Sequence, residues 1–152
     1  MDNDEAMLLA LKIAAEASVT SGDVPVGAII FNSAGEVIAT GNNKRELHND
    51  PTAHAEIVAI RIAAEKTGSW RVDDHTLVVT LEPCAMCAGA IAQARMPRLV
   101  FGAWDAKAGA VGSVWDVLRD PRSLHSMEIT AGVRGKECAD LLKEFFEGHR
   151  ER

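Results

Sequence analysis

The chain has 152 residues with a formal net charge of −6, and 47% of the residues are apolar and 25% charged. This balance favours one folded domain with its own hydrophobic core, and it excludes a disordered chain and a strongly basic nucleic-acid-binding protein. No apolar stretch approaches the roughly 20 residues that span a bilayer, and the amino terminus is acidic where a secretion signal would be basic. We therefore expect a soluble, cytoplasmic protein that does not enter a membrane.

Hydrophobic spacing predicts helices and strands in alternation along the chain. The amino-terminal half predicts a helix over 5–18 capped by Asp4, strands over 26–31 and 36–40, a polar loop over 41–52, and a helix over 53–66. The other half predicts a strand over 76–81, a helix from Pro83 to Arg95, a strand over 98–103, a loop over 104–113, a helical turn over 114–118, an edge strand over 128–131 and a helix over 136–147. With no internal repeat or linker, this order predicts one α/β domain whose sheet is covered on both faces.

Two short motifs carry candidate chemistry, each at the start of a predicted helix. They are His54-Ala55-Glu56 and Pro83-Cys84-Ala85-Met86-Cys87. Alone, each is weak evidence, because a histidine at a helix start is commonly a cap and a C-x-x-C can be a thioredoxin-like redox pair. In thioredoxin-like proteins, however, the C-x-x-C motif normally follows the first strand of its βα unit. Here the His-x-Glu motif comes a whole βα segment before the C-x-x-C motif. Together the motifs favour a metal site, and the third cysteine, Cys138, fits a small buried apolar residue.

The spacing of these residues predicts a catalytic zinc ion. Cys84 and Cys87 are three residues apart and share one face of a helix, and the first turn of a helix favours the thiolate form that binds zinc. His54 adds a third ligand, which leaves the fourth position of a tetrahedral ion open, as in catalytic sites. His48 and His75 could close the site, but neither has a compelling spacing.

Glu56 is the candidate general acid and base. A zinc-bound water has its pKa lowered to about 7, and a group nearby must take its proton and pass it to a leaving amine. A carboxylate two residues beyond a ligand lies on another face of the helix, so Glu56 can reach the water without binding the metal. The alternative is a glutamate that only stabilises the helix start.

The arrangement H-x-E…P-C-x-x-C resembles the signature of the cytidine deaminase-like zinc deaminases. Within them, the chain is most similar to bacterial tRNA-specific adenosine deaminases. The stretches that carry this resemblance cover nearly the whole chain: 24–28, Asn43, 50–57, 81–90, 101–113 and the closing helix.

The resemblance implies a three-layer sandwich, formed as a single deaminase domain over residues 1–152, with a five-stranded mixed sheet between helices. It implies a homodimer with one Zn²⁺ per chain that converts adenosine to inosine at the wobble position of a tRNA anticodon stem-loop. By the same resemblance, Asn43 contacts the base, Val26 and Ala55 line its pocket, and Asp105 lies beside the flanking nucleotides. The alternatives are a turn residue for Asn43, core packing for Val26 and a loop cap for Asp105.

Candidate contacts to RNA are few. Five acidic residues and one basic residue fall within residues 1–25, and the carboxyl-terminal tail is nearly neutral. The candidates for phosphate contact are Lys44, Arg45, Lys107, Arg119 and Arg122. Phe145 and Phe146 are adjacent and cannot face the same way on a helix, so one is expected in the core and the other near a nucleotide or a dimer partner.

Two other functions remain open from the sequence. A deaminase of a free guanine or cytosine base or nucleoside would use the same zinc ligands and Glu56. A catalytically silent zinc module would not need Glu56, which argues against that reading.

Overall fold

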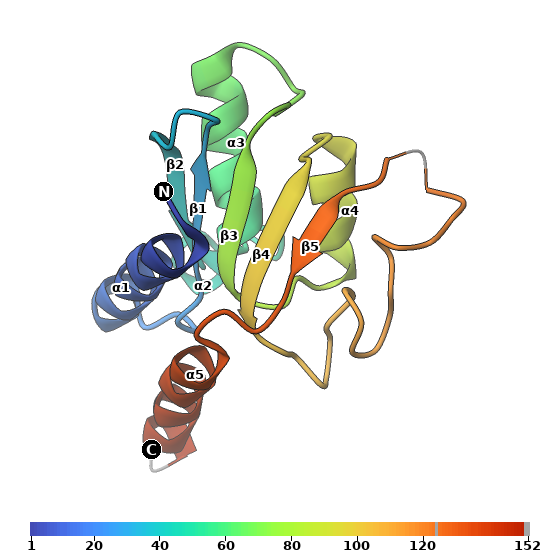
Figure 1. Cartoon of the computed structure of the whole chain (residues 1–152). Helices are drawn as coiled ribbons and strands as arrows, with labels where there is room; N and C mark the ends of the chain where they lie inside the picture. Colours follow the sequence, from blue (N-terminus) through green and yellow to red (C-terminus); the bar gives the residue numbers. More distant parts are fainter. Residues whose placement is uncertain (124, 151–152) are drawn as a thin grey trace.

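The computed structural model of the chain describes residues 1–123 and 125–150, and it shows a sheet between two layers of helices (Figure 1). The five strands lie in the order β2-β1-β3-β4-β5. They are β1 (Gly27–Phe31), β2 (Val37–Asn42), β3 (Thr76–Leu81), β4 (Arg98–Ala103) and β5 (Glu128–Thr130). The helices are α1 (Asn3–Ser21), α2 (Arg45–His48), α3 (Ala55–Thr67), α4 (Ala85–Gln93) and α5 (Gly135–Arg150). The expected mixed sheet is confirmed, because β1 pairs antiparallel with β2 and β3, whereas β3, β4 and β5 run parallel.

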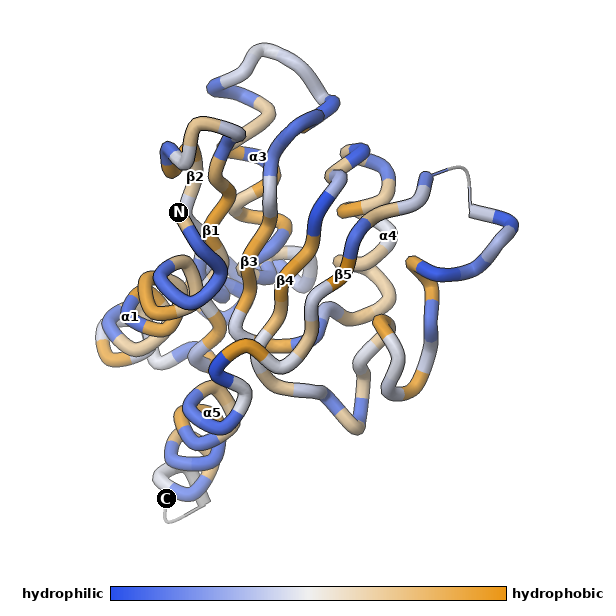
Figure 2. Tube along the Cα trace, in the orientation of Figure 1, coloured by the Kyte–Doolittle hydropathy of each residue, from blue (hydrophilic) through white to orange (hydrophobic). Residues whose placement is uncertain are grey.

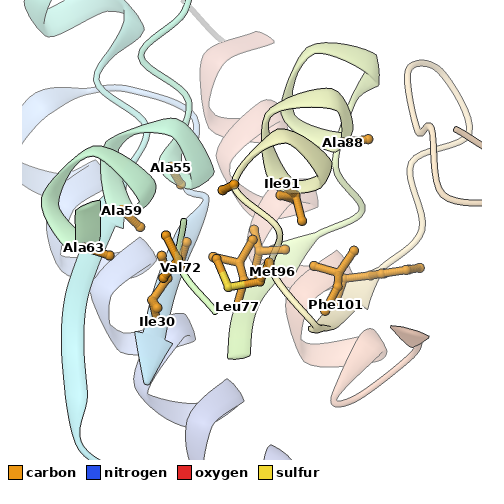
Figure 3. Close-up of a cluster of buried hydrophobic side chains, with 14 of the residues drawn as sticks. Ile30, Ala55, Ala59, Ala63, Val72, Leu77, Ala88, Ile91, Met96 and Phe101 are labelled. Atoms are coloured by element: carbon orange, nitrogen blue, oxygen red, sulfur yellow. The ribbon is translucent and has the colours of Figure 1, made fainter. Parts of the chain in front are cut away.

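Alternate residues of the central strands supply two hydrophobic cores. Ile30, Leu77 and Phe101 pack against α3 and α4, and the residues between them in the strands pack against α1 and α5. Figure 2 shows the resulting run of apolar residues along β1, β3 and β4, and Figure 3 shows the core beneath α3 and α4. Because both faces are buried, the strands read as continuous apolar runs in the sequence.

The first helix is longer than expected and has a different cap. Its N-cap is Asp2, whose carboxylate accepts a hydrogen bond from the Glu5 amide at 2.8 Å. Asp4, the expected cap, instead pairs with Arg134 at 2.7 Å and so joins α1 to the start of α5. The helix also continues to Ser21, where Gly22 ends it in a left-handed conformation.

Two further segments differ from the sequence prediction. The expected helical turn at 114–118 is absent, because Val111 and Asp116 form an antiparallel bridge that extends this stretch. The polar loop after β2 contains the short helix α2, whose first amides at Glu46 and Leu47 donate to the Asp23 carboxylate. That cap lies more than 20 residues away in the chain and could not be recognised from local sequence.

No helix in the described part of the chain is long and apolar enough to cross a membrane.

One edge of the sheet gathers the ends of several elements. The carboxyl ends of β2, β3 and β4 meet the amino end of β1 there, as the strand directions require. Helices α3 and α4 also begin at this edge. Gly41 of β2 permits the close approach of α3, because a Cβ at this position would lie 2.3 Å from the carbonyl oxygen of Ala55. Ligand sites of α/β proteins commonly form at such an edge.

Candidate active site

His54 and Cys84 occupy equivalent places, as the N-cap residues of α3 and α4. Neither side chain makes the capping hydrogen bond that a serine or aspartate would make there. Both side chains instead turn toward each other, and Cys87 reaches the same point from the first turn of α4. The Nδ1 atom of His54 lies 3.6 Å from the Cys84 sulfur and 3.5 Å from the Cys87 sulfur.

These separations fit a tetrahedral zinc ion. With Zn–S bonds of about 2.3 Å and a Zn–N bond of about 2.1 Å, tetrahedral angles place nitrogen and sulfur about 3.6 Å apart. The three donor atoms lie within 4.8 Å of one another. A hydrogen-bonded reading explains less, because the single lone pair of Nδ1 cannot accept two thiol protons well. The residues therefore fit the metal that the sequence predicts.

His54, Cys84 and Cys87 shift one another's pKa values. The hydrogen bond from Cys87 lowers the pKa of the Cys84 thiol to about 4, and the same interaction raises the pKa of Cys87. The hydrogen bond to Cys84 raises the pKa of His54. The cluster thus already stabilises one thiolate, which is the form that binds zinc.

Glu56 lies in the first turn of α3 and is 4% exposed. Burial raises the pKa of its carboxyl to about 7, and the carboxyl lies against the Cys87 thiol. Among the described residues, the cluster that could hold a metal consists of His54, Cys84 and Cys87. Glu56 therefore lies beside the metal site but outside the ligand set, as the sequence predicts for a group that moves protons.

A pocket of about 570 Å³ opens at this edge of the sheet. Its volume falls within the range of small-molecule sites, roughly 300–1,000 Å³. All but one of the site residues expected from the sequence line it: Val26, Asn43, His54, Ala55, Glu56, Cys84 and Asp105. The exception, Cys87, is fully buried.

Asn43 and Asp105 line the pocket and also hold local turns. The Oδ1 atom of Asn43 accepts a hydrogen bond from the Arg45 amide at 3.1 Å. Asp105 accepts from the amides of Lys107 and Ala108 at 3.0 and 3.2 Å. The local structural interpretation of both residues is therefore confirmed, and their place in the pocket lining leaves them free to meet a ligand as well.

Of the five basic residues proposed for phosphate contact, Lys44 lies at the N-cap of α2 and does not line the pocket, and the other four divide into two groups. Arg45 and Lys107 line the pocket. Arg119 and Arg122 lie elsewhere and pair with Asp116 and Asp120, respectively. Few positive charges therefore face the pocket.

Seven lining residues were not recognised from the sequence as parts of the site: Val24, Leu81, Glu82, Trp104, Ala106, Ala108 and Leu142. Trp104 and Glu82 follow β4 and β3, and Leu142 projects from α5. Phe146, one of the two phenylalanines considered above, also lines the pocket. Phe145 is half-buried, and its ring packs edge-on against the ring of Phe146. Only the assembly of distant segments brings these residues together, although an acidic residue between a buried strand and Pro83 is a signal that could have drawn attention to Glu82.

Glu82 is 2% exposed and anchors the loop after β4. Its carboxylate accepts hydrogen bonds from the amides of Asp105, Val111 and Ser113 at 2.9, 2.9 and 3.1 Å, and from the Ser113 hydroxyl. Burial disfavours its charged form, but these donors outweigh burial and hold the pKa of the carboxyl below its usual value. One buried charge thus fixes the loop that forms a wall of the pocket.

The sequence of this chain matches a known protein family. Residues 1–103 match the family model for the cytidine and deoxycytidylate deaminase zinc-binding region. The chain therefore belongs to this family of zinc-binding deaminases.

Individual relatives narrow the comparison. A tRNA-specific adenosine deaminase from Haemophilus influenzae is 44% identical over 149 residues, covering 98% of this chain and 86% of the relative. A solved structure from a study of A-to-I editing by tRNA:A34 deaminases at the wobble position of transfer RNA has a TM-score of 0.85 and 42% identity, covering 90% of this chain and 98% of that chain. A guanine deaminase from Bacillus subtilis has a TM-score of 0.66 and 30% identity, covering 100% and 96%. The resemblance inferred from the sequence is confirmed.

Proposed function

We propose that this protein converts adenosine to inosine at the wobble position of a tRNA anticodon. The observation that carries the proposal is the convergence of His54, Cys84 and Cys87 on one point beside the buried Glu56, in the wall of a pocket. The tRNA-specific relative and the solved wobble deaminase support the choice of substrate, because each is more than 40% identical to this chain.

The residues divide the reaction between them. His54, Cys84 and Cys87 would hold the zinc ion, which makes water acidic enough to act as the nucleophile near neutral pH. Glu56 takes a proton from the nucleophile and delivers one to N6 of adenine, so that the amine leaves as ammonia. The Oδ1 atom of Asn43 is engaged by the Arg45 amide, so its Nδ2 group remains the donor for an acceptor on the base. Val26 and Ala55 shape the pocket wall, and Asp105 faces the flanking nucleotides.

Deamination of free guanine is the second candidate, because a guanine deaminase shares 30% identity and the fold. The lining of the pocket favours a polymer. It includes two exposed aromatic side chains, Trp104 and Phe146, together with Arg45 and Lys107. A single base enclosed beside Glu56 would not need these outer residues.

A substrate panel separates the two candidates. An anticodon stem-loop with adenosine at the wobble position should form inosine, whereas free adenosine should be almost inert and a stem-loop with cytidine there should remain unchanged. The contacts to flanking nucleotides orient the reacting base, so a truncated substrate loses turnover as well as affinity. Inosine, uridine and xanthine are measured under equal enzyme and salt. Faster turnover of free guanine, cytosine or adenosine than of the stem-loop would replace the proposal.

We further propose that the whole chain, residues 1–152, forms one deaminase domain that works in the cytoplasm as a homodimer. The loop over 109–117 runs beside the start of α4, where Gly109 bridges to Cys84. This region exposes Met86, Val114, Trp115 and Val117. Such a cluster of exposed apolar side chains is typical of an interface between protein chains.

The dimer makes its own prediction. In sedimentation velocity, the wild-type protein should have twice the mass of one chain, and Trp115→Glu should shift it toward the monomer because a charge would be buried in the interface. Glu128→Gln, an exposed change on β5, serves as the control. A wild-type protein that sediments as a monomer at micromolar concentration would contradict the homodimer.

A further inference from the structure

Trp104 is an exposed aromatic residue at the rim of the pocket. It directly follows β4, its residue is 53% exposed, and it lines the same pocket as Glu56. Phe146 of α5 also lines this pocket and is 47% exposed. An exposed indole offers a large, flat apolar face that a bound ring can cover. The position of Trp104 on the pocket wall suggests that a ligand does so.

The Trp104 ring is held in place before any ligand arrives. It packs edge-on against Phe101, with ring centroids 4.9 Å apart and an interplanar angle of 85°. It also lies over Gly112, where a Cβ would be 3.2 Å from the ring and the φ angle of +127° favours glycine. Glu82 binds the amides of Asp105 and Ser113, the residues that follow Trp104 and Gly112 in the chain. The ring therefore pays little conformational entropy on binding a flat partner.

The charge around the pocket increases the need for such a contact. Arg45 and Lys107 are the basic side chains in its lining, and they share it with Glu56, Glu82 and Asp105. The whole chain has a net charge of −6. Phosphate neutralisation can therefore supply only a small part of the affinity for RNA. Stacking on aromatic side chains is the other main source, and each stacked base typically contributes roughly 5- to 150-fold in affinity.

We propose that Trp104 is a stacking platform for a nucleobase adjacent to the one that is deaminated. The reacting base must lie deeper, beside His54 and Glu56, whereas Trp104 presents its exposed ring at the rim. An unpaired anticodon loop has neighbouring bases that can splay onto such a surface. Trp104 is thus a specificity-determining residue for single-stranded RNA. This inference rests on the proposed function, because it requires an RNA substrate.

Two substitutions separate stacking from simple apolar contact. Trp104→Phe keeps an aromatic face, and Trp104→Leu keeps an apolar side chain without one. We expect Trp104→Leu to raise the Kd for the stem-loop about tenfold or more, and to lower kcat by a smaller factor, because only one of several contacts that orient the reacting base is lost. Trp104→Phe should retain most of the affinity. Trp70→Leu is the matched control, because Trp70 is 63% exposed but does not line the pocket.

Binding is measured by fluorescence anisotropy of a labelled stem-loop, together with the zinc content of each variant. Because this readout needs no deamination, a wild-type protein that binds the stem-loop but forms no inosine would refute the proposed function alone. Equal losses in Trp104→Phe and Trp104→Leu, or no loss in either, would refute the stacking role. If Trp104→Leu changed the sedimentation of the protein but not its affinity for the stem-loop, Trp104 would contact another protein chain rather than a nucleobase. A wild-type protein that does not bind the stem-loop would overturn both ideas.

Abasic substrates locate the stacked base. One stem-loop lacks the base on the 5′ side of the adenosine, and another lacks the base on the 3′ side. One of these abasic stem-loops should bind the wild-type protein more weakly than the intact stem-loop does. The Trp104→Leu variant should bind that abasic stem-loop and the intact one equally well, since the two changes remove the same contact. Additive losses at both positions would show that Trp104 stacks on neither neighbour.

Discussion

Glu56→Gln should reduce turnover by roughly 10²- to 10⁴-fold while the protein keeps its fold and its zinc. Glutamine has nearly the same shape as glutamate but cannot take up a proton and deliver it to the leaving amine. Because Glu56 lies outside the cluster of His54, Cys84 and Cys87, its loss should not release the metal. The measurement is inosine formation on the stem-loop, with zinc content determined by mass spectrometry.

The control for this change lies in the same helix. Glu65→Gln alters an exposed carboxylate of α3 and should leave both activity and zinc unchanged. If Glu56→Gln retained activity within threefold of the wild type, Glu56 would not be the acid and base. A variant that lost its zinc would instead identify Glu56 as a metal ligand.

Cys87→Ala should lose most of the zinc and nearly all activity together. Cys87 is fully buried, and its sulfur lies 3.5 Å from Nδ1 of His54, the separation that a shared tetrahedral ion requires. Two remaining ligands bind zinc far more weakly than three. The purified wild-type protein should hold about one zinc per chain, measured by elemental analysis beside the deaminase assay.

Cys138→Ala is the matched control for the loss of a cysteine. Cys138 is also buried, but it lies in the core between α5 and the sheet, away from the pocket. This variant should keep its zinc and its activity, with at most a modest loss of stability from the missing sulfur. Circular dichroism separates metal loss from unfolding. A fully active wild-type protein with far less than one zinc per chain would contradict the metal site.

The sequence predicted best those elements whose signals are local. The strands Thr76–Leu81 and Arg98–Ala103 have the predicted bounds, because apolar, mostly branched runs end in the chain at clear interruptions such as Pro83. The metal cluster was also predictable, because its residues lie at fixed spacing near two helix starts. The start of α1 was not, since Asp2 and Asp4 are both plausible caps and a distant partner, Arg134, decides which one serves.

Contacts between distant segments explain what the sequence did not predict. The stretch 114–118 has apolar residues that suit a helical turn, but hydrogen bonds to the buried Glu82 carboxylate hold the preceding residues in another path. Likewise, nothing near Trp104 or Phe146 in the sequence shows that they share a pocket. Trp104 directly follows β4, and α5 begins beside the end of β4 (Figure 1), so only the folded chain brings Phe146 of α5 into the same pocket.

The position of His54 and Cys84 at the starts of two helices also affects the stability of the fold. Neither side chain caps its helix, so both are available to bind an ion. An ion bound to both would link α3 to α4 and close a loop that spans 30 residues of sequence. In the chain-entropy model, a covalent link around a loop of this size is worth about 3–4 kcal/mol. The same ion would then serve as a cross-link between the two helices that begin at the pocket. Binding of the ion would supply both reactivity and rigidity, and its release would remove both.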